Sequence, residues 1–315
     1  EFVLPPMLSR LTIVADFALR FWTLLLTQSP QFPHMRRLEL LGRRRILESH
    51  ESQTFEWCKW FPNLEHLEYW SVHRQSQQLS LATLPRTLTH LAAHLCGAVT
   101  SVDPPESNWP EHLQFLSLHL QTPPQASPFS SVPYNAWHGQ HLPTSLTVLR
   151  LNYRFRSAEL LPWSALPRNL LEFSFTGGPV SRSGARYKSA DFAALPRTLV
   201  SLELSALEFN PELATTVREL EALPRSLTNF KCHMQHRWEA TPALANALPC
   251  GLRSVKSVFE ALEAEHVPLL VCPESVVRLK LNLSGTRAAL GRQTAPPAPF
   301  VPQLLQRFTH LKKVQ

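Results

Sequence analysis

Aspartate is nearly absent from this chain of 315 residues, which contains only Asp16, Asp103 and Asp191. A carboxylate cluster for Mg²⁺ or Ca²⁺ would therefore depend wholly on glutamate, and no such cluster is evident. The signatures of phosphate-binding loops, dinucleotide-binding folds, serine hydrolases and zinc proteases are also absent. The sequence thus predicts no enzyme, no catalytic residue and no cofactor.

Cysteine and long apolar runs are scarce as well. The five cysteines are widely spread and form no C-x-x-C pair, which favours a reducing compartment and an intracellular (cytoplasmic or nuclear) location. The most apolar stretch, residues 11–26, is interrupted by Asp16 and Arg20, which argues against a membrane span or a signal peptide. Because the chain begins at Glu1 rather than methionine, we interpret it as a processed or excised fragment.

Composition favours a folded chain with many short elements. Hydrophobic residues make up 44% and charged residues 17%, too apolar and too weakly charged for disorder. Only 9 glycines but 28 prolines are present, so rigid prolines must reset the chain direction. The formal net charge of +7 is a mild bias towards an acidic partner, although a solvated basic surface explains it equally well.

An internal repeat dominates the sequence. Its frame is an apolar residue, proline, two variable residues and then L-x-x-L-x-L, as in LPTSLTVLRL from Leu142 and LPRTLVSLEL from Leu195. A variant one residue shorter occurs as FPHMRRLEL from Phe32 and FPNLEHLEY from Phe61. Successive frame prolines from Pro143 onward are separated by 24, 29, 28, 25 and 24 residues. The frame recurs about eleven times, and its period lies in the range of roughly 20–29 residues expected of leucine-rich repeats.

The frame predicts how one repeat packs on the next. Its L-x-L end is a short strand whose leucines point to one side and whose intervening residues point to the other. Stacking such units pairs the strands into a parallel sheet and merges the leucines into one core. Segments rich in Ala, Leu and Glu before the prolines predict short return helices, at residues 158–166, 190–195, 212–223 and 242–248.

These repeats resemble those of leucine-rich-repeat proteins over nearly the whole chain. The resemblance implies an α/β solenoid, a horseshoe with a parallel concave sheet and short convex helices or irregular segments. The L-P-x-[ST]-L opening is similar to FNIP-type repeats, with Phe209, Asn210 and Pro211 echoing their F-N-x-P element, and FPNLEHLEY looks like repeats found behind F-box modules. We therefore expect a single domain, residues 1–315, of about eleven irregular repeats. Segments 121–141, 177–189 and 285–302 are interpreted as loop insertions, with or without a binding role.

The alternation also predicts which side chains form the concave face. The early strands offer histidines and aromatic residues, the middle strands include carboxylates, and the late strands carry only positive charges. Exposed aromatic residues are typical of interface anchors. We expect partner contacts from His66, Glu68, Trp70, His90, His94, Phe115, His119, Arg150, Lys231, Lys256, Arg278 and Lys280.

A metal site and a thiol nucleophile are both disfavoured. The four early histidines fall on neighbouring strands rather than in a ligand motif, and no aspartate or cysteine on their face completes a set. Ordinary polar surface residues are the better interpretation. Cys232 takes the inward place of a core leucine beside His233, which indicates a buried structural thiol.

The expected function is that of a protein-interaction scaffold, which binds a macromolecular partner on its concave face. We expect the chain to be monomeric, and the basic late repeats are compatible with an acidic protein partner. A narrower alternative, implied by the resemblance, is the substrate-receptor part of an F-box-type ubiquitin ligase, whose F-box would have to lie before Glu1. Another alternative is binding of nucleic acid or an anionic surface through the basic late repeats, which should weaken steeply with salt.

Overall fold

The structure is a computed structural model, in which the chain divides into two compact units. The first comprises Glu1–Leu161 with Gly177–Gly184, and the second comprises Pro162–Thr176 with Ala185–Gln315. Each unit is described by itself. The structure describes residues 5, 7–14, 31–41, 56–70, 83–96, 109–121, 142–154, 163–177, 187–204, 207–208, 212–234, 246–259, 277–282 and 313–314.

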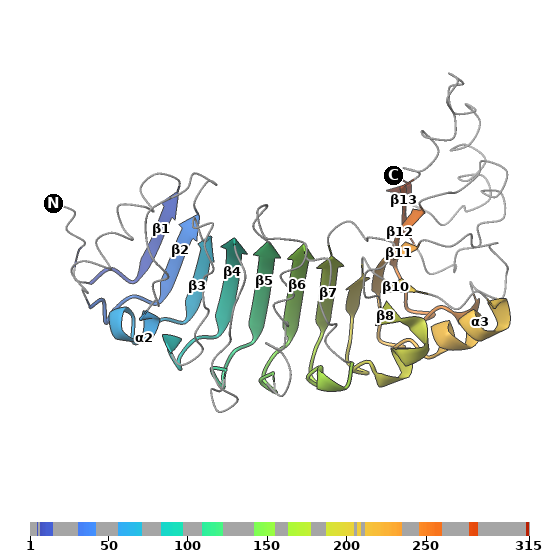
Figure 1. The fold of residues 1–315 in the computed structure, drawn as a ribbon, viewed down its shortest axis with the longest axis horizontal. Coiled ribbons are helices and arrows are strands. Elements are labelled where there is room, and N and C mark those ends of the chain that lie inside the picture. Colours follow the sequence, from blue (N-terminus) through green and yellow to red (C-terminus); the bar gives the residue numbers. More distant parts are fainter. Residues whose placement is uncertain are drawn as a thin grey trace, which may run out of the picture. The chain divides into compact units, whose positions relative to one another are not determined.

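The first unit contains parallel strands that lie side by side in chain order (Figure 1). Each strand pairs with the next so that the first core residue of one frame faces that of its neighbour, as in Leu91↔Leu116 and Leu116↔Leu149. The one described helix of this unit is α2, Trp57–Trp60. The strands are β1 (Arg10–Val14), β2 (Arg37–Leu41), β3 (His66–Trp70), β4 (His90–Cys96), β5 (Phe115–Gln121) and β6 (Val148–Arg154).

The second unit repeats this arrangement. Its strands also pair in parallel, with Phe173↔Leu202 and Leu202↔Phe230 at equivalent places. A separate pair, β8 (Tyr187–Lys188) and β10 (Leu207–Glu208), is also parallel. The strands are β7 (Glu172–Gly177), β9 (Ser201–Leu204), β11 (Asn229–Met234), β12 (Ser254–Phe259), β13 (Arg278–Asn282) and β14 (Lys313–Val314), and the helical segments are η3 (Trp163–Ala165), η4 (Ser189–Ala194) and α3 (Leu213–Glu221).

The repeat leucines form the core of each unit. Leu149 and Phe173 are fully buried, and Leu202 and Phe230 are 1% and 2% exposed. Burying a side chain of this kind contributes about 1.5–3 kcal/mol, so a single strand gains its stability only when stacked. Cys232 is fully buried at its inward position, which confirms that it is a core thiol.

Backbone hydrogen bonds explain why the spacing within the frame is the same from repeat to repeat. The proline carbonyl accepts a hydrogen bond from the leucine amide three residues later, for example from Leu88 to Pro85 at 3.1 Å. One residue after that leucine, Thr89 donates its amide to the carbonyl of Glu65 in the preceding repeat at 2.8 Å, and His90 donates to the same carbonyl at 3.0 Å. The tight turn therefore fixes where each strand begins against its neighbour.

The Ser or Thr of the L-P-x-[ST]-L frame joins adjacent repeats. The hydroxyl of Ser226 lies 2.7 Å from the carbonyl oxygens of both Arg197 and Leu199 in the preceding repeat. Thr198 makes the same contacts to Arg168 and Leu170, at 2.7 and 2.8 Å. This residue thus supplies a hydrogen-bond donor to two turn carbonyls of the preceding repeat.

The two units are parallel-strand solenoids of leucine-rich-repeat type, which confirms the predicted fold class. Among the described residues, η3, η4 and α3 fall within three of the four predicted return segments or one residue outside them. The described part of the fourth segment includes a helical turn at residues 246–247. Most of the three predicted insertions lies outside the described residues, but the second includes β8. The single-domain assignment stays a prediction. Within the described segments, no helix has the length and apolar character needed to cross a membrane.

Candidate interaction surface

The outward face of the first unit is the side of the sheet opposite the buried leucines. The parallel register arranges its side chains in rows that run across the strands. Because neighbouring parallel strands lie about 4.8 Å apart, residues in one row can touch. The first row is Arg10, Arg37, His66, His90, Phe115 and Val148, and the second is Thr12, Glu39, Glu68, Ala92, Ser117 and Arg150. The third has two parts, Val14 with Leu41, and Trp70 with His94, His119 and Asn152.

Three rings of the first row form a continuous stack. The ring centroids of His66 and His90 are 3.9 Å apart, with 17° between the ring planes. His90 and Phe115 repeat this contact at 3.9 Å and 7°. The guanidinium carbon of Arg150 lies 5.5 Å from the centre of the Phe115 ring, within the range of a cation–π contact. We call these four side chains the ring stack.

A second pair of rings lies in the third row. His94 and His119 stack with their centroids 5.0 Å apart and an interplanar angle of 24°. The backbone of Trp70 is in register with that of His94. The side chain of Trp70 lies outside the described part of the chain, so its predicted anchoring role stays a prediction.

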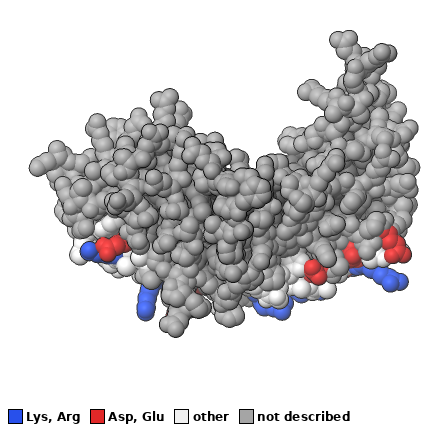
Figure 2. Space-filling view, in the orientation of Figure 1, with Lys and Arg blue, Asp and Glu red and all other residues white. Residues whose placement is uncertain are grey.

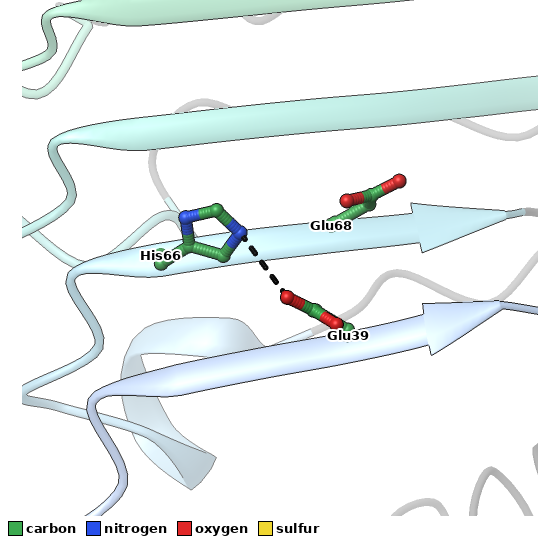
Figure 3. Close-up of side chains that lie close together, drawn as sticks. All are labelled: Glu39, His66 and Glu68. Atoms are coloured by element: carbon green, nitrogen blue, oxygen red, sulfur yellow. Dashed lines mark ion pairs between the residues drawn. The ribbon is translucent and has the colours of Figure 1, made fainter. Parts of the chain in front are cut away.

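An acidic corner adjoins the ring stack on β2 and β3 (Figure 3). Glu39 and Glu68 are register partners, and His66 precedes Glu68 by two residues, so all three lie on one face. Their potential ligand atoms lie within 4.8 Å of one another. The Nε2 atom of His66 is 3.8 Å from the Glu39 carboxylate. Arg37 donates to the same Glu39 oxygen from its Nε atom at 2.6 Å.

Burial and neighbouring charges set the protonation states of this face. Desolvation lowers the pKa of His66, and the positive charge of Arg37 adds to that effect. Desolvation also lowers the pKa of His90 and of His94 to about 4 each. The hydrogen bond from Arg37 is the largest cause lowering the pKa of Glu39. At neutral pH these imidazoles are therefore neutral and the Glu39 carboxylate is charged.

The second unit presents a row of lysine positions instead of rings. Lys231 on β11 is in register with Lys256 on β12, which is in register with Lys280 on β13. We call these three positions the lysine row. Lys231 forms an ion pair with Glu203 of β9. The side chains of Lys256, Lys280 and Arg278 lie outside the described residues.

Charges of both signs occur along the edge where the strands begin. Figure 2 shows positive and negative side chains interspersed on this edge. Arg36 and Glu65 form one such ion pair at 3.0 Å, with both side chains about half exposed. Exposed pairs of this kind contribute little stability, typically below about 1 kcal/mol.

The structure brings together most of the site residues predicted in the early repeats. His66, His90, Phe115 and Arg150 form the ring stack, and Glu68 lies in the acidic corner. Their role in binding stays a prediction, as does that of the late basic residues.

The concave-face residues predicted from the sequence do not include those on β1 and β2. Thr12, Arg37 and Glu39 hold outward positions beside Leu11 and Leu38, and Glu39 is the centre of the acidic corner. The sequence does carry the signal, because FPHMRRLEL has the same alternation as FPNLEHLEY, but the predicted concave-face residues begin at His66.

No family model matches the chain, and no curated protein matches it. Among solved structures, the chain is similar to the leucine-rich repeat-containing protein LegL7 from Legionella pneumophila. That match has 14% sequence identity and a TM-score of 0.34, and it covers 74% of this chain and 85% of that one.

Proposed function

We propose that the chain is a non-enzymatic scaffold that binds a protein partner on the outward face of its first unit. The ring stack is the observation that supports this proposal most strongly. Its rings already pack on one another at 3.9 Å, so binding would order few additional side chains. Aromatic residues and arginine are also the types that most often supply the binding energy of protein interfaces.

Several narrower expectations belong to the same proposal. The chain would act as a monomer inside the cell, in the cytoplasm or nucleus, where its free thiols stay reduced. Among the described residues, Cys58, Cys232 and Cys250 are free thiols, which is compatible with that setting. In a more specific version the repeats are of the FNIP or F-box-associated type and receive substrates for a ubiquitin ligase.

A second candidate is an anionic partner on the second unit, either an acidic protein segment or nucleic acid. The lysine row supports it, because like charges in adjacent strands repel one another unless an anion compensates them. Glu203 supplies that compensation for Lys231, while the side chains of Lys256 and Lys280 lie outside the described residues. Binding of this kind depends on salt, whereas binding to the ring stack depends mainly on buried apolar area.

A photo-crosslinking amino acid tests the first candidate. Placed at Val148, it lies next to Phe115 in the first row; placed at Glu111, it lies on an exposed turn away from the rings. The partner crosslinked from Val148 is identified, purified and titrated against the unmodified chain. We expect Phe115→Ala to weaken binding about 30-fold, the cost of about 2 kcal/mol typical of a central interface residue.

Arg150→Ala should weaken the same complex to a smaller degree, because it leaves the rings in place. Glu111→Ala is the matched control and should change affinity less than twofold. Thermal unfolding of each variant checks that the repeats remain folded. Equal crosslinking from both positions, or unchanged affinity in Phe115→Ala, would show that the partner binds elsewhere.

A further inference from the structure

The acidic corner combines two carboxylates and one imidazole from neighbouring repeats. Glu39 comes from β2, while His66 and Glu68 come from β3 (Figure 3). The alternation of each strand and the parallel register are enough to place all three on one side of the sheet. One nitrogen with two carboxylate oxygens is a donor set used for zinc and related divalent transition metals.

The imidazole of His66 is the observation besides proximity that points to a cation. The Nε2 atom of His66 is buried and has no hydrogen-bond partner among the described residues, although it is directed at the Glu39 carboxylate. Leaving a buried polar atom without a partner costs about 1–3 kcal/mol, so such an atom calls for an explanation. The carboxylate of Glu68 is only partly exposed and lies within 4.8 Å of the other two donors.

We propose that Glu39, His66 and Glu68 bind a divalent transition-metal ion such as Zn²⁺, with water or a partner's side chain as the fourth ligand. The site shares His66 with the ring stack, but metal binding is measured on the chain alone and so does not depend on the proposed scaffold function. At bond lengths of about 2.1 Å, tetrahedral zinc ligands lie about 3.4 Å apart. The donors now lie within 4.8 Å of one another, so rotations of the glutamate side chains suffice to close the set.

Arg37 and Thr12 have opposite roles in this site. The guanidinium of Arg37 occupies one oxygen of Glu39 and must move away when a metal binds. Thr12 donates its hydroxyl to the other oxygen at 3.0 Å and orients the carboxylate, as outer partners of metal ligands commonly do. Removal of Arg37 should therefore tighten metal binding, whereas a purely structural ion-pair cluster would gain nothing from it.

Calorimetric titration of the full, untagged chain with Zn²⁺ tests the proposal, with Co²⁺ absorption as a second measurement. We expect His66→Ala and Glu68→Gln each to weaken one binding event at least tenfold, because even the loss of an outer partner of a metal ligand costs about 10–100-fold. Arg37→Ala should tighten the same event. Mg²⁺ at equal concentration should not displace Co²⁺, because it prefers octahedral oxygen ligands.

Matched controls separate this site from the chain's other histidines and glutamates. His112→Ala and Glu65→Gln remove an exposed histidine and an exposed glutamate outside the acidic corner, and neither should change the titration. Thermal unfolding without metal establishes that every variant is folded. If the His66→Ala and Glu68→Gln titrations match that of the unmodified chain, or if Arg37→Ala weakens binding, the proposed site is wrong.

Discussion

At the scale of single residues, the hydroxyl of the L-P-x-[ST]-L frame links adjacent repeats by hydrogen bonds. Ser226 exemplifies it, with its Oγ atom 2.7 Å from each of two carbonyls in the preceding repeat. We expect Ser226→Ala to lower the free energy of unfolding by about 1 kcal/mol, the net contribution of a typical hydrogen bond. Ser164→Ala, at an exposed position in η3, should stay within about 0.5 kcal/mol of the unmodified chain. Urea unfolding measures both variants. Equal changes in the free energy of unfolding would contradict a stabilising contact between repeats at Ser226.

The sequence shows that such a residue recurs but not what it contacts. The recurrence of LPRTL and LPRSL is visible in the sequence. The carbonyls that accept hydrogen bonds from Thr198 and Ser226 belong to the preceding repeat, almost thirty positions earlier, and no local pattern indicates them. Only the stacking distance and the register decide which carbonyls come within reach. Side-chain contacts between repeats are therefore the part of this fold that residue patterns leave open.

At the scale of strands, the pair β4 and β5 makes stability sensitive to pH. Burial, helped by the nearby His119, lowers the pKa of His94 from 6.5 to about 4. The unfolded chain therefore binds a proton at this residue that the folded chain does not, and protonation favours unfolding. Well above pH 6.5 the imidazole is neutral in both states, so it does not change the free energy of unfolding. Stability should fall as the pH drops from about 6.5 to about 4.

His94→Gln removes this titration and should make that part of the pH profile less steep, while His90, whose pKa is also lowered to about 4, retains part of the slope. Urea midpoints measured across the same interval give the comparison. His112→Gln, at an exposed turn, serves as the control and should retain the slope of the unmodified chain. A His94→Gln profile parallel to that of the unmodified chain would mean that His94 titrates alike in the folded and unfolded states.

Strand alternation explains how much of the surface was predictable. The inward leucines and outward residues of β3 to β6 follow directly from the period of two, and their burial confirms it. The ring stack required more, because His66, His90 and Phe115 meet only if three successive repeats keep the same register. The acidic corner was predictable as well, because FPHMRRLEL and FPNLEHLEY have the same length and align Glu39 with Glu68; the predicted face omitted Glu39 because it began at β3.

At the scale of the whole molecule, the net charge of +7 concerns the second candidate function. A single-stranded, uridine-rich RNA labelled with a fluorophore is a direct probe of the lysine row. If three lysines neutralise three phosphates, affinity should fall about 20-fold between about 50 and 200 mM salt. Lys256→Glu with Lys280→Glu should abolish this binding and flatten the salt dependence. Arg168→Glu with Arg225→Glu gives the same net charge from exposed turns and should leave most of the affinity. Equal losses of affinity in the two double variants would assign the binding to net charge rather than to the lysine row. If the RNA does not bind even at low salt, an acidic protein segment is the remaining candidate for this surface.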